Sequence, residues 1–148
     1  MNISELFAAW EEDSIFDREY LSEESIKIPQ LHSKWMKFLA TERMKHKAAA
    51  QAYKVLYRDK HSYYSGTLDK ETLDQYGWEP FELRVIRGDL SMYLDSDPDL
   101  GELQTKSDVA QEKVKFIEGV IGQINVRGFQ IKNVIDWEKF KAGLNGWW

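Results

Sequence analysis

The chain has 148 residues, which suits one compact domain or a small domain with an extension used for assembly. Hydrophobic residues make up 43% and aromatic residues 14%, so the composition favours a buried core over intrinsic disorder. The absence of cysteine excludes disulfide scaffolds, thiolate metal sites and cysteine nucleophiles. Residues 1–14 are acidic and no long apolar run occurs, so neither a secretory signal nor a membrane span is predicted, and a cytoplasmic location is expected.

The net charge of −5 conceals an uneven distribution along the chain. Residues 1–25 carry eight acidic side chains and one basic one, whereas residues 26–60 carry nine basic and two acidic ones. Residues 61–100 are again acidic, with nine acids against three bases. Because a phosphate backbone is bound by local positive charge, residues 26–60 are the candidate nucleic-acid-binding segment. Mutual neutralisation of the acidic and basic segments within the fold is the alternative.

Two helices are predicted in the first half of the chain. Asn2 and Glu5 have the spacing of a capping box and open a short helix. A long helix follows, which either begins at Pro29 or begins near Ser22 and is kinked by the proline. Ser65-Gly66 is expected to end it, since glycine suits the left-handed position after a helix. Its apolar face is predicted to comprise Ile28, Leu31, Trp35, Phe38, Leu39, Ala49, Tyr53, Leu56, Tyr57 and Tyr64.

The middle of the chain is less regular. Residues 67–77 indicate an acidic loop with room for one helical turn, and residues 81–86 are compatible with either a brief strand or a helix start. Asp89 is placed to cap a short helix that ends near Leu94. Asp97-Pro98 combines an N-cap with a proline at the first helical position, so a second long helix is predicted to begin there. Its apolar face is predicted to comprise Leu103, Ala110, Val114, Ile117, Val120, Ile121 and Ile124.

A row of cations is the main candidate site. Four basic residues recur at i, i+4, i+11 and i+15 along one side of the long helix, and they are Arg43, Lys47, Lys54 and Arg58. Lys60, Tyr63 and Tyr64 follow directly. Cations that track a backbone beside aromatic rings are typical of proteins that bind single strands without sequence preference. Trp35, Tyr53 and Tyr57 are instead predicted to lie in the core. A basic helix row that is only a solvated surface is the alternative to DNA binding.

No catalytic or metal-binding motif is found. The run Asp95-x-Asp97-x-Asp99 resembles the start of a calcium loop, but Pro98 interrupts it and Lys106 stands where a bidentate glutamate is needed. The chain has no phosphate-binding loop, nucleophile elbow or zinc-binding HExxH sequence. The sequence therefore predicts a non-enzymatic protein without a cofactor or metal. A metal-dependent nuclease built on the acidic clusters is the less favoured alternative.

A final helix, residues 129–141, is predicted after an interruption at Arg127-Gly128, and it ends before Gly143. It carries apolar residues on nearly every side, namely Phe129, Ile131, Val134, Ile135, Trp137 and Phe140. A helix that is apolar all round needs to be buried all round, and self-assembly is the simplest way to achieve this in a small protein. The alternative is a central core helix within a monomer. We therefore expect residues 1–126 to form a helical domain that binds single-stranded DNA, and residues 127–148 to form an oligomerisation helix and tail.

Five motifs stand out in the sequence, and they are Ser33-Lys34-Trp35, Arg58-x-Lys60, Tyr63-Tyr64-Ser65-Gly66, Arg127 to Asn133, and Trp137-Glu138-Lys139-Phe140. With these motifs the chain resembles the UvsY family, the recombination mediator proteins of T4-like phages, along essentially its whole length. The Tyr-Tyr-Ser-Gly motif and the Arg-Gly-Phe-x-Ile-Lys motif together are fairly specific.

The resemblance implies an all-α fold and a ring-like homo-oligomer built through the C-terminal helix. It also implies binding of single-stranded DNA and loading of a RecA-like recombinase onto strands coated by single-strand-binding protein, in the cytoplasm of an infected host cell. The basic pair Arg58 and Lys60 is implied to contact DNA. The chain departs from this pattern in its acidic net charge and in the final Trp147-Trp148, which has no family parallel. A scaffold or adaptor that bridges proteins without binding DNA is the alternative function.

Overall fold

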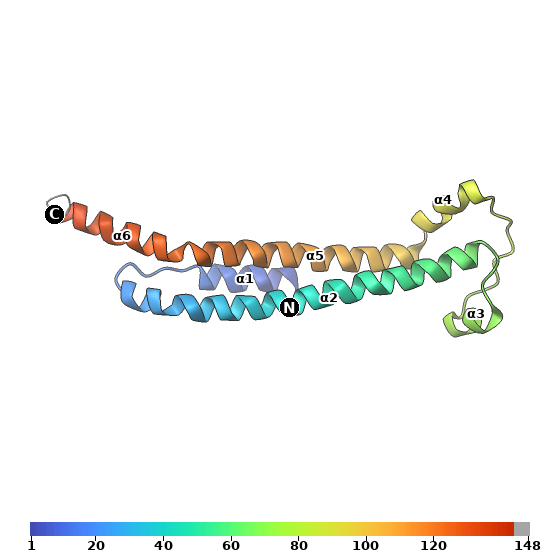
Figure 1. The fold of residues 1–148 in the computed structure, drawn as a ribbon, viewed down its shortest axis with the longest axis horizontal. Coiled ribbons are helices and arrows are strands. Elements are labelled where there is room, and N and C mark those ends of the chain that lie inside the picture. The colour runs from blue at the N-terminus through green and yellow to red at the C-terminus, as the bar shows by residue number, and fades with distance from the viewer. Residues whose placement is uncertain (144–148) are drawn as a thin grey trace. The chain divides into compact units, whose positions relative to one another are not determined.

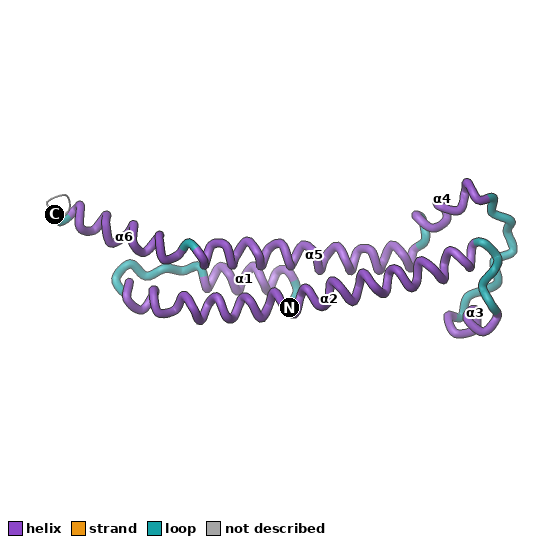
Figure 2. Tube along the Cα trace, viewed as in Figure 1, coloured by secondary structure: helices purple, strands orange, loops and turns teal. Residues whose placement is uncertain are grey.

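The computed structural model describes residues 1–143, and this range contains helices and loops but no strand (Figures 1 and 2). The elements in chain order are α1 (Ile3–Asp13), α2 (Leu21–Tyr64), α3 (Lys70–Tyr76), the 3-10 helix η1 (Arg87–Asp89), α4 (Leu90–Asp95), α5 (Pro98–Asn125) and α6 (Arg127–Lys141). The predicted all-α fold is confirmed. Within the described range, no helix is both long enough and apolar enough to span a lipid bilayer.

The helix boundaries follow the local signals in the sequence. Asn2 and Glu5 form the predicted capping box, in which each backbone N–H donates to the other residue's side chain at 2.8 Å. Gly66 follows α2 with a φ of +74°, a left-handed conformation that glycine adopts without a steric penalty. At the start of α5, the Asp97 carboxylate accepts a hydrogen bond of 3.0 Å from the Leu100 backbone.

The structure resolves the alternatives that the sequence left open. Helix α2 begins at Leu21 and continues through Pro29, so the proline lies inside the helix and does not begin it. The acidic segment 67–77 contains α3, a helix of seven residues capped by Asp69. Residues 81–86 form neither a strand nor a helix. Asp89 precedes α4 as expected, but its side chain forms no capping hydrogen bond.

The chain forms two compact units, and each of the long helices α2 and α5 contributes residues to both. We call residues 1–42 together with 112–143 the terminal unit, and residues 43–111 the middle unit. The candidate assembly helix α6 belongs to the same unit as α1, and the division of roles at residue 126 stays a prediction.

The core of the terminal unit surrounds Trp35, where α1 lies beside α2 and α5 (Figure 1). Trp35 is fully buried, and the rings of Trp10, Phe38 and Phe116 meet it edge-on. Its indole N–H donates to the Asp13 carboxylate at 2.9 Å, so the one polar atom of the buried ring has a partner. The other buried core residues are Leu6, Leu39, Ile117, Val120 and Ile124, and the last three lie on the predicted apolar face of α5.

Candidate nucleic-acid interface

The four cations predicted as a row on α2 are all exposed, and all lie in the middle unit. Lys47 and Lys54 form no ion pair with any residue in the described range. Arg58 contacts the Asp59 carboxylate at 3.1 Å through Nε, yet its side chain is 72% exposed. The row therefore presents positive charge to solvent along four turns of one helix.

Helix geometry explains why this row faces solvent. An α-helix turns about 100° per residue, so Arg43, Lys47, Lys54 and Arg58 fall within about 60° of one another. The buried residues of the same stretch, which include Ala49 and Lys60, fall roughly on the opposite side. Packing of that opposite side leaves the cationic row uncovered within the middle unit.

Lys60 lies on the packed side of α2 and is only 5% exposed. Its ammonium group contacts the carboxylates of Asp97 at 3.0 Å and Asp99 at 2.8 Å, and lies 4.0 Å from the centre of the Trp78 ring. The Tyr64 hydroxyl donates to the same Asp97 carboxylate at 2.6 Å. The positive charge of Lys60 is therefore matched inside the middle unit, where it joins the end of α2 to the start of α5.

The pKa values in this network reflect the pairing. Burial lowers the pKa of Lys60, but the hydrogen bonds and charges of Asp99 and Asp97 outweigh it, so the pKa lies above its usual value. Burial likewise raises the pKa of Asp97, but hydrogen bonds from Tyr64, Leu100 and Lys60 outweigh it and hold the pKa below the usual value. Burial and the neighbouring Asp97 raise the pKa of Tyr64. The lysine and the aspartate therefore stay charged and the tyrosine stays neutral near pH 7.

Tyr63 and Tyr64 belong to an aromatic cluster that packs residues 78–81 against the end of α2. The Tyr63 ring lies 5.1 Å from that of Trp78, and its hydroxyl donates to the Glu79 carbonyl at 2.6 Å. The Tyr64 ring lies 5.0 Å from that of Phe81. The expectation that Lys60, Tyr63 and Tyr64 extend an exposed binding surface does not match these positions, because all three side chains are engaged in internal packing.

Two other tyrosines on α2 also differ from expectation. Trp35 is a core residue as predicted, but Tyr57 is 40% exposed and Tyr53 is half-buried. Their rings lie against each other at 6.0 Å. The apolar spacing predicted that Trp35, Tyr53 and Tyr57 are all core residues. Only Trp35 is fully buried, because neighbouring residues cover Tyr53 and Tyr57 less completely.

Helix α6 is packed on one side only. Ile131 is 6% exposed and Val134 is half-buried, so these two predicted assembly residues face the terminal unit. Phe129, Trp137 and Phe140 are 69%, 54% and 57% exposed, and Ile135 is also exposed. The rings of Trp137 and Phe140 stack at 5.5 Å. The alternative of a central core helix is therefore wrong for this chain. The final pair Trp147-Trp148 lies outside the residues that the structure describes.

The described range contains no group of three or more histidine or acidic side chains arranged to hold a metal ion. Asp97 caps α5 and pairs with Lys60, which accounts for the resemblance of its surroundings to a calcium loop. The sequence did not reveal the partners of Lys60. The sequence indicated Asp97 only as a helix cap, and no sequence pattern predicted that Trp78 lies near Lys60.

These features define an all-helical protein with a cationic row on one long helix and exposed aromatic side chains on its last helix. Residues 9–144 match the family described as "Recombination, repair and ssDNA binding protein UvsY". The chain therefore belongs to the UvsY family of recombination mediators.

Similar proteins support the same assignment along the whole chain. The chain is 24% identical to the recombination protein uvsY of Enterobacteria phage T4 over 143 residues, which covers 97% of this chain and 99% of the phage protein. Two crystal structures of the bacteriophage T4 recombination mediator protein UvsY, lattice types II and IV, each match with a TM-score of 0.83 and 24% identity. They cover 96% and 95% of this chain and 98% and 99% of the T4 chain, and they show that the fold is shared.

Proposed function

We propose that this protein binds single-stranded DNA through the cationic row and promotes loading of a RecA-like recombinase onto strands coated by single-strand-binding protein. The observation that supports this most is the exposure of Arg43, Lys47, Lys54 and Arg58 along one side of α2. If the acidic segments neutralised the whole row, Lys47 and Lys54 would be paired as well. Instead, Lys47 and Lys54 have no ion-pair partner within the described residues.

The row acts by neutralising phosphates, and no bond is made or broken. From Arg43 to Arg58 the helix rises about 22 Å, so the row can follow several nucleotides of an extended strand. Phosphate contacts release bound counterions, and binding through them is independent of sequence and weakens with salt. A strand held along such a row keeps its bases accessible, which is what a recombinase requires.

Assembly through α6 multiplies this weak site. We propose a ring-like homo-oligomer in which the exposed aromatic side chains of α6 contact neighbouring copies. Binding of one row to a strand then places the other rows at a high effective concentration, so the oligomer binds far more tightly than one subunit. This multiplication also compensates for the acidic net charge of the chain.

Fluorescence anisotropy with a labelled single strand, measured across a salt series, tests the role of the row. We expect the Lys47→Ala/Lys54→Ala double variant to bind roughly tenfold or more weakly and to show a shallower dependence of affinity on salt, by about 0.7 per lost phosphate contact. A Lys70→Ala/Lys106→Ala variant changes net charge equally at two exposed lysines outside the row, and it should bind like the parent.

Two results would count against this proposal. If the parent protein does not bind the strand even at low salt, the chain acts without DNA and the scaffold alternative is favoured. If the row variant and its control lose the same affinity, the row has no special role and binding depends on overall charge.

A further inference from the structure

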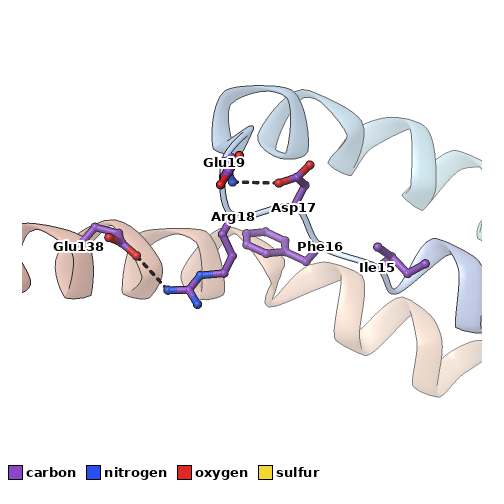
Figure 3. Close-up of a pocket in the computed structure, with 6 residues that line it drawn as sticks. All are labelled: Ile15, Phe16, Asp17, Arg18, Glu19 and Glu138. Atoms are coloured by element: carbon purple, nitrogen blue, oxygen red, sulfur yellow. Dashed lines mark hydrogen bonds and ion pairs between the residues drawn. The ribbon is translucent and has the colours of Figure 1, made fainter.

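A pocket with a volume of about 670 Å³ lies where the loop between α1 and α2 meets α6 (Figure 3). Arg18 pairs with Glu138 at 2.9 Å in its wall. The other residues that line it are Ile15, Phe16, Asp17 and Glu19. Because this pocket borders α6, it falls within the region already proposed for assembly.

A smaller pocket, with a volume of about 180 Å³, lies in the middle unit and includes no residue of the cationic row or of α6. We call it the middle-unit pocket. None of its lining residues is charged, and they are Tyr63, Gly66, Leu68, Leu73, Pro80 and Phe81. An apolar cavity of about 150 Å³ is large enough to hold a benzene ring. The middle-unit pocket therefore has room for one aromatic or leucine side chain.

Backbone hydrogen bonds hold the walls of the middle-unit pocket. Gly66 follows α2 in the left-handed conformation, and the next N–H, that of Thr67, donates to the Ser62 carbonyl at 2.9 Å. The end of α3 is closed in the same way. The Tyr63 hydroxyl donates to the Glu79 carbonyl at 2.6 Å and so joins the segment after α3 to α2. The pocket is therefore a part of the folded middle unit.

The sequence around the middle-unit pocket is acidic. Residues 66–83 carry five acidic side chains and one basic one. Four lining residues are each followed or preceded by an acidic residue, and these neighbours are Asp69, Asp74, Glu79 and Glu82. All four are exposed, and none forms an ion pair with another residue in the range that the structure describes. Such a rim repels the phosphates of nucleic acid and attracts cationic side chains.

We propose that the middle-unit pocket binds a basic segment of another protein. One aromatic or leucine side chain of that segment fills the pocket, and flanking lysine or arginine side chains lie against the acidic rim. The volume of the pocket sets the number of apolar anchors at one, and the rim sets the sign of the flanking charges. This inference goes beyond the proposed function, because it depends on neither the cationic row nor assembly.

The position of the pocket on α2 allows a strand and a protein to be held together. Around the helix axis, Tyr63 points roughly 140–200° away from each residue of the cationic row. The pocket and the row therefore lie on different sides of the same helix. A basic protein segment in the pocket does not compete with DNA for the row.

A basic peptide with one aromatic residue, Lys-Arg-Phe-Arg-Lys, serves as the probe for the full-length protein. An aromatic ring in the pocket shifts the methyl NMR signals of the leucines beside it. We expect the signals of Leu68 and Leu73 to shift on addition of the peptide, and those of Leu6 and Leu39, in the core of the terminal unit, to stay unchanged. The same peptide with alanine in place of phenylalanine should bind roughly tenfold or more weakly.

The acidic rim is tested by the Glu79→Gln/Glu82→Gln variant, which removes two charges but keeps the size of both side chains. Both residues are exposed, so the fold is retained. We expect this variant to bind the peptide roughly fivefold more weakly than the parent does. The Glu11→Gln/Glu12→Gln variant removes the same charge at two exposed residues of the terminal unit, and it should bind the peptide like the parent.

Four results would overturn the inference. The first is that the Leu68 and Leu73 signals do not move even at low salt. The second is that the phenylalanine and alanine peptides bind equally well, because the pocket then receives no anchor. The third is an equal loss of affinity in the rim variant and its control, which indicates attraction by overall charge alone. The fourth is that the peptide lowers the mass measured by light scattering, which indicates that a second copy of the chain occupies the pocket.

Discussion

Replacing Lys60 by Ala is expected to lower the free energy of unfolding by about 3 kcal/mol, because it leaves a buried carboxylate without its cation. Asp97 is 3% exposed and would keep only its hydrogen bonds from Tyr64 and Leu100. Lys60 also lies over the Trp78 ring, so the substitution removes a contact between α2 and the loop that contains Trp78. The expected loss corresponds to a fall in Tm of roughly 10 °C for a chain of this size.

Urea unfolding followed by circular dichroism measures this effect, with Lys54→Ala as the matched control. Lys54 lies on the same helix and is exposed, so its loss should change the free energy of unfolding by no more than about 0.5 kcal/mol. For DNA binding, we expect the reverse: the Lys54 substitution has the larger effect and the Lys60 substitution the smaller one. Lys54→Ala reduces the salt dependence of affinity, whereas folded Lys60→Ala protein keeps the parent's salt dependence. A Lys60→Ala protein as stable as the parent would contradict the assignment of Lys60 to internal packing.

Removing the exposed aromatic side chains of α6 is expected to weaken DNA binding by about 100-fold or more without touching the cationic row. The Trp137→Ser/Phe140→Ser variant keeps every charge of the row but loses the assembly that joins several rows on one strand. Linked weak sites gain about 10²- to 10⁴-fold over single ones, so separating the subunits should forfeit a gain of that size.

Anisotropy and light scattering on the same samples check this prediction. Ile26→Ser/Met92→Ser is the matched control, because it also removes two exposed apolar side chains, which are 67% and 60% exposed, from outside α6. The control should keep both its mass and its affinity. If the α6 variant falls to single subunits but binds DNA like the parent, the affinity does not come from multivalency.

Local signals made much of the fold predictable. The capping box of α1, the Asp97-Pro98 start of α5 and the glycine end of α2 each depend on residues within one helical turn. Such signals act through nearby backbone groups, so the sequence displays them directly. Residues 78–86 lack them, and their path depends on contacts of Trp78 and Phe81 with aromatic rings elsewhere in the chain.

The candidate site was predictable only in part, and the pair Arg58-x-Lys60 shows why. Residues two apart in a helix point about 200° away from each other, so one strand of DNA cannot lie against both along a single row. Helical spacing alone therefore places Lys60 away from the side that carries Arg58, although both residues were predicted to contact DNA. The spacing did not identify the partners of Lys60, because Asp97 and Asp99 lie far from it in the sequence. The pocket at Ile15 escaped prediction for the same reason, since Glu138 closes it from the other end of the sequence.

The most direct test of the central claim measures how much labelled RecA-like recombinase binds a single strand already coated with single-strand-binding protein. With recombinase limiting, the parent protein should increase the amount bound, and the Lys47→Ala/Lys54→Ala variant should give little or no increase. The claim would be contradicted if the parent protein gave no increase, or if the variant loaded the recombinase as well as the parent does.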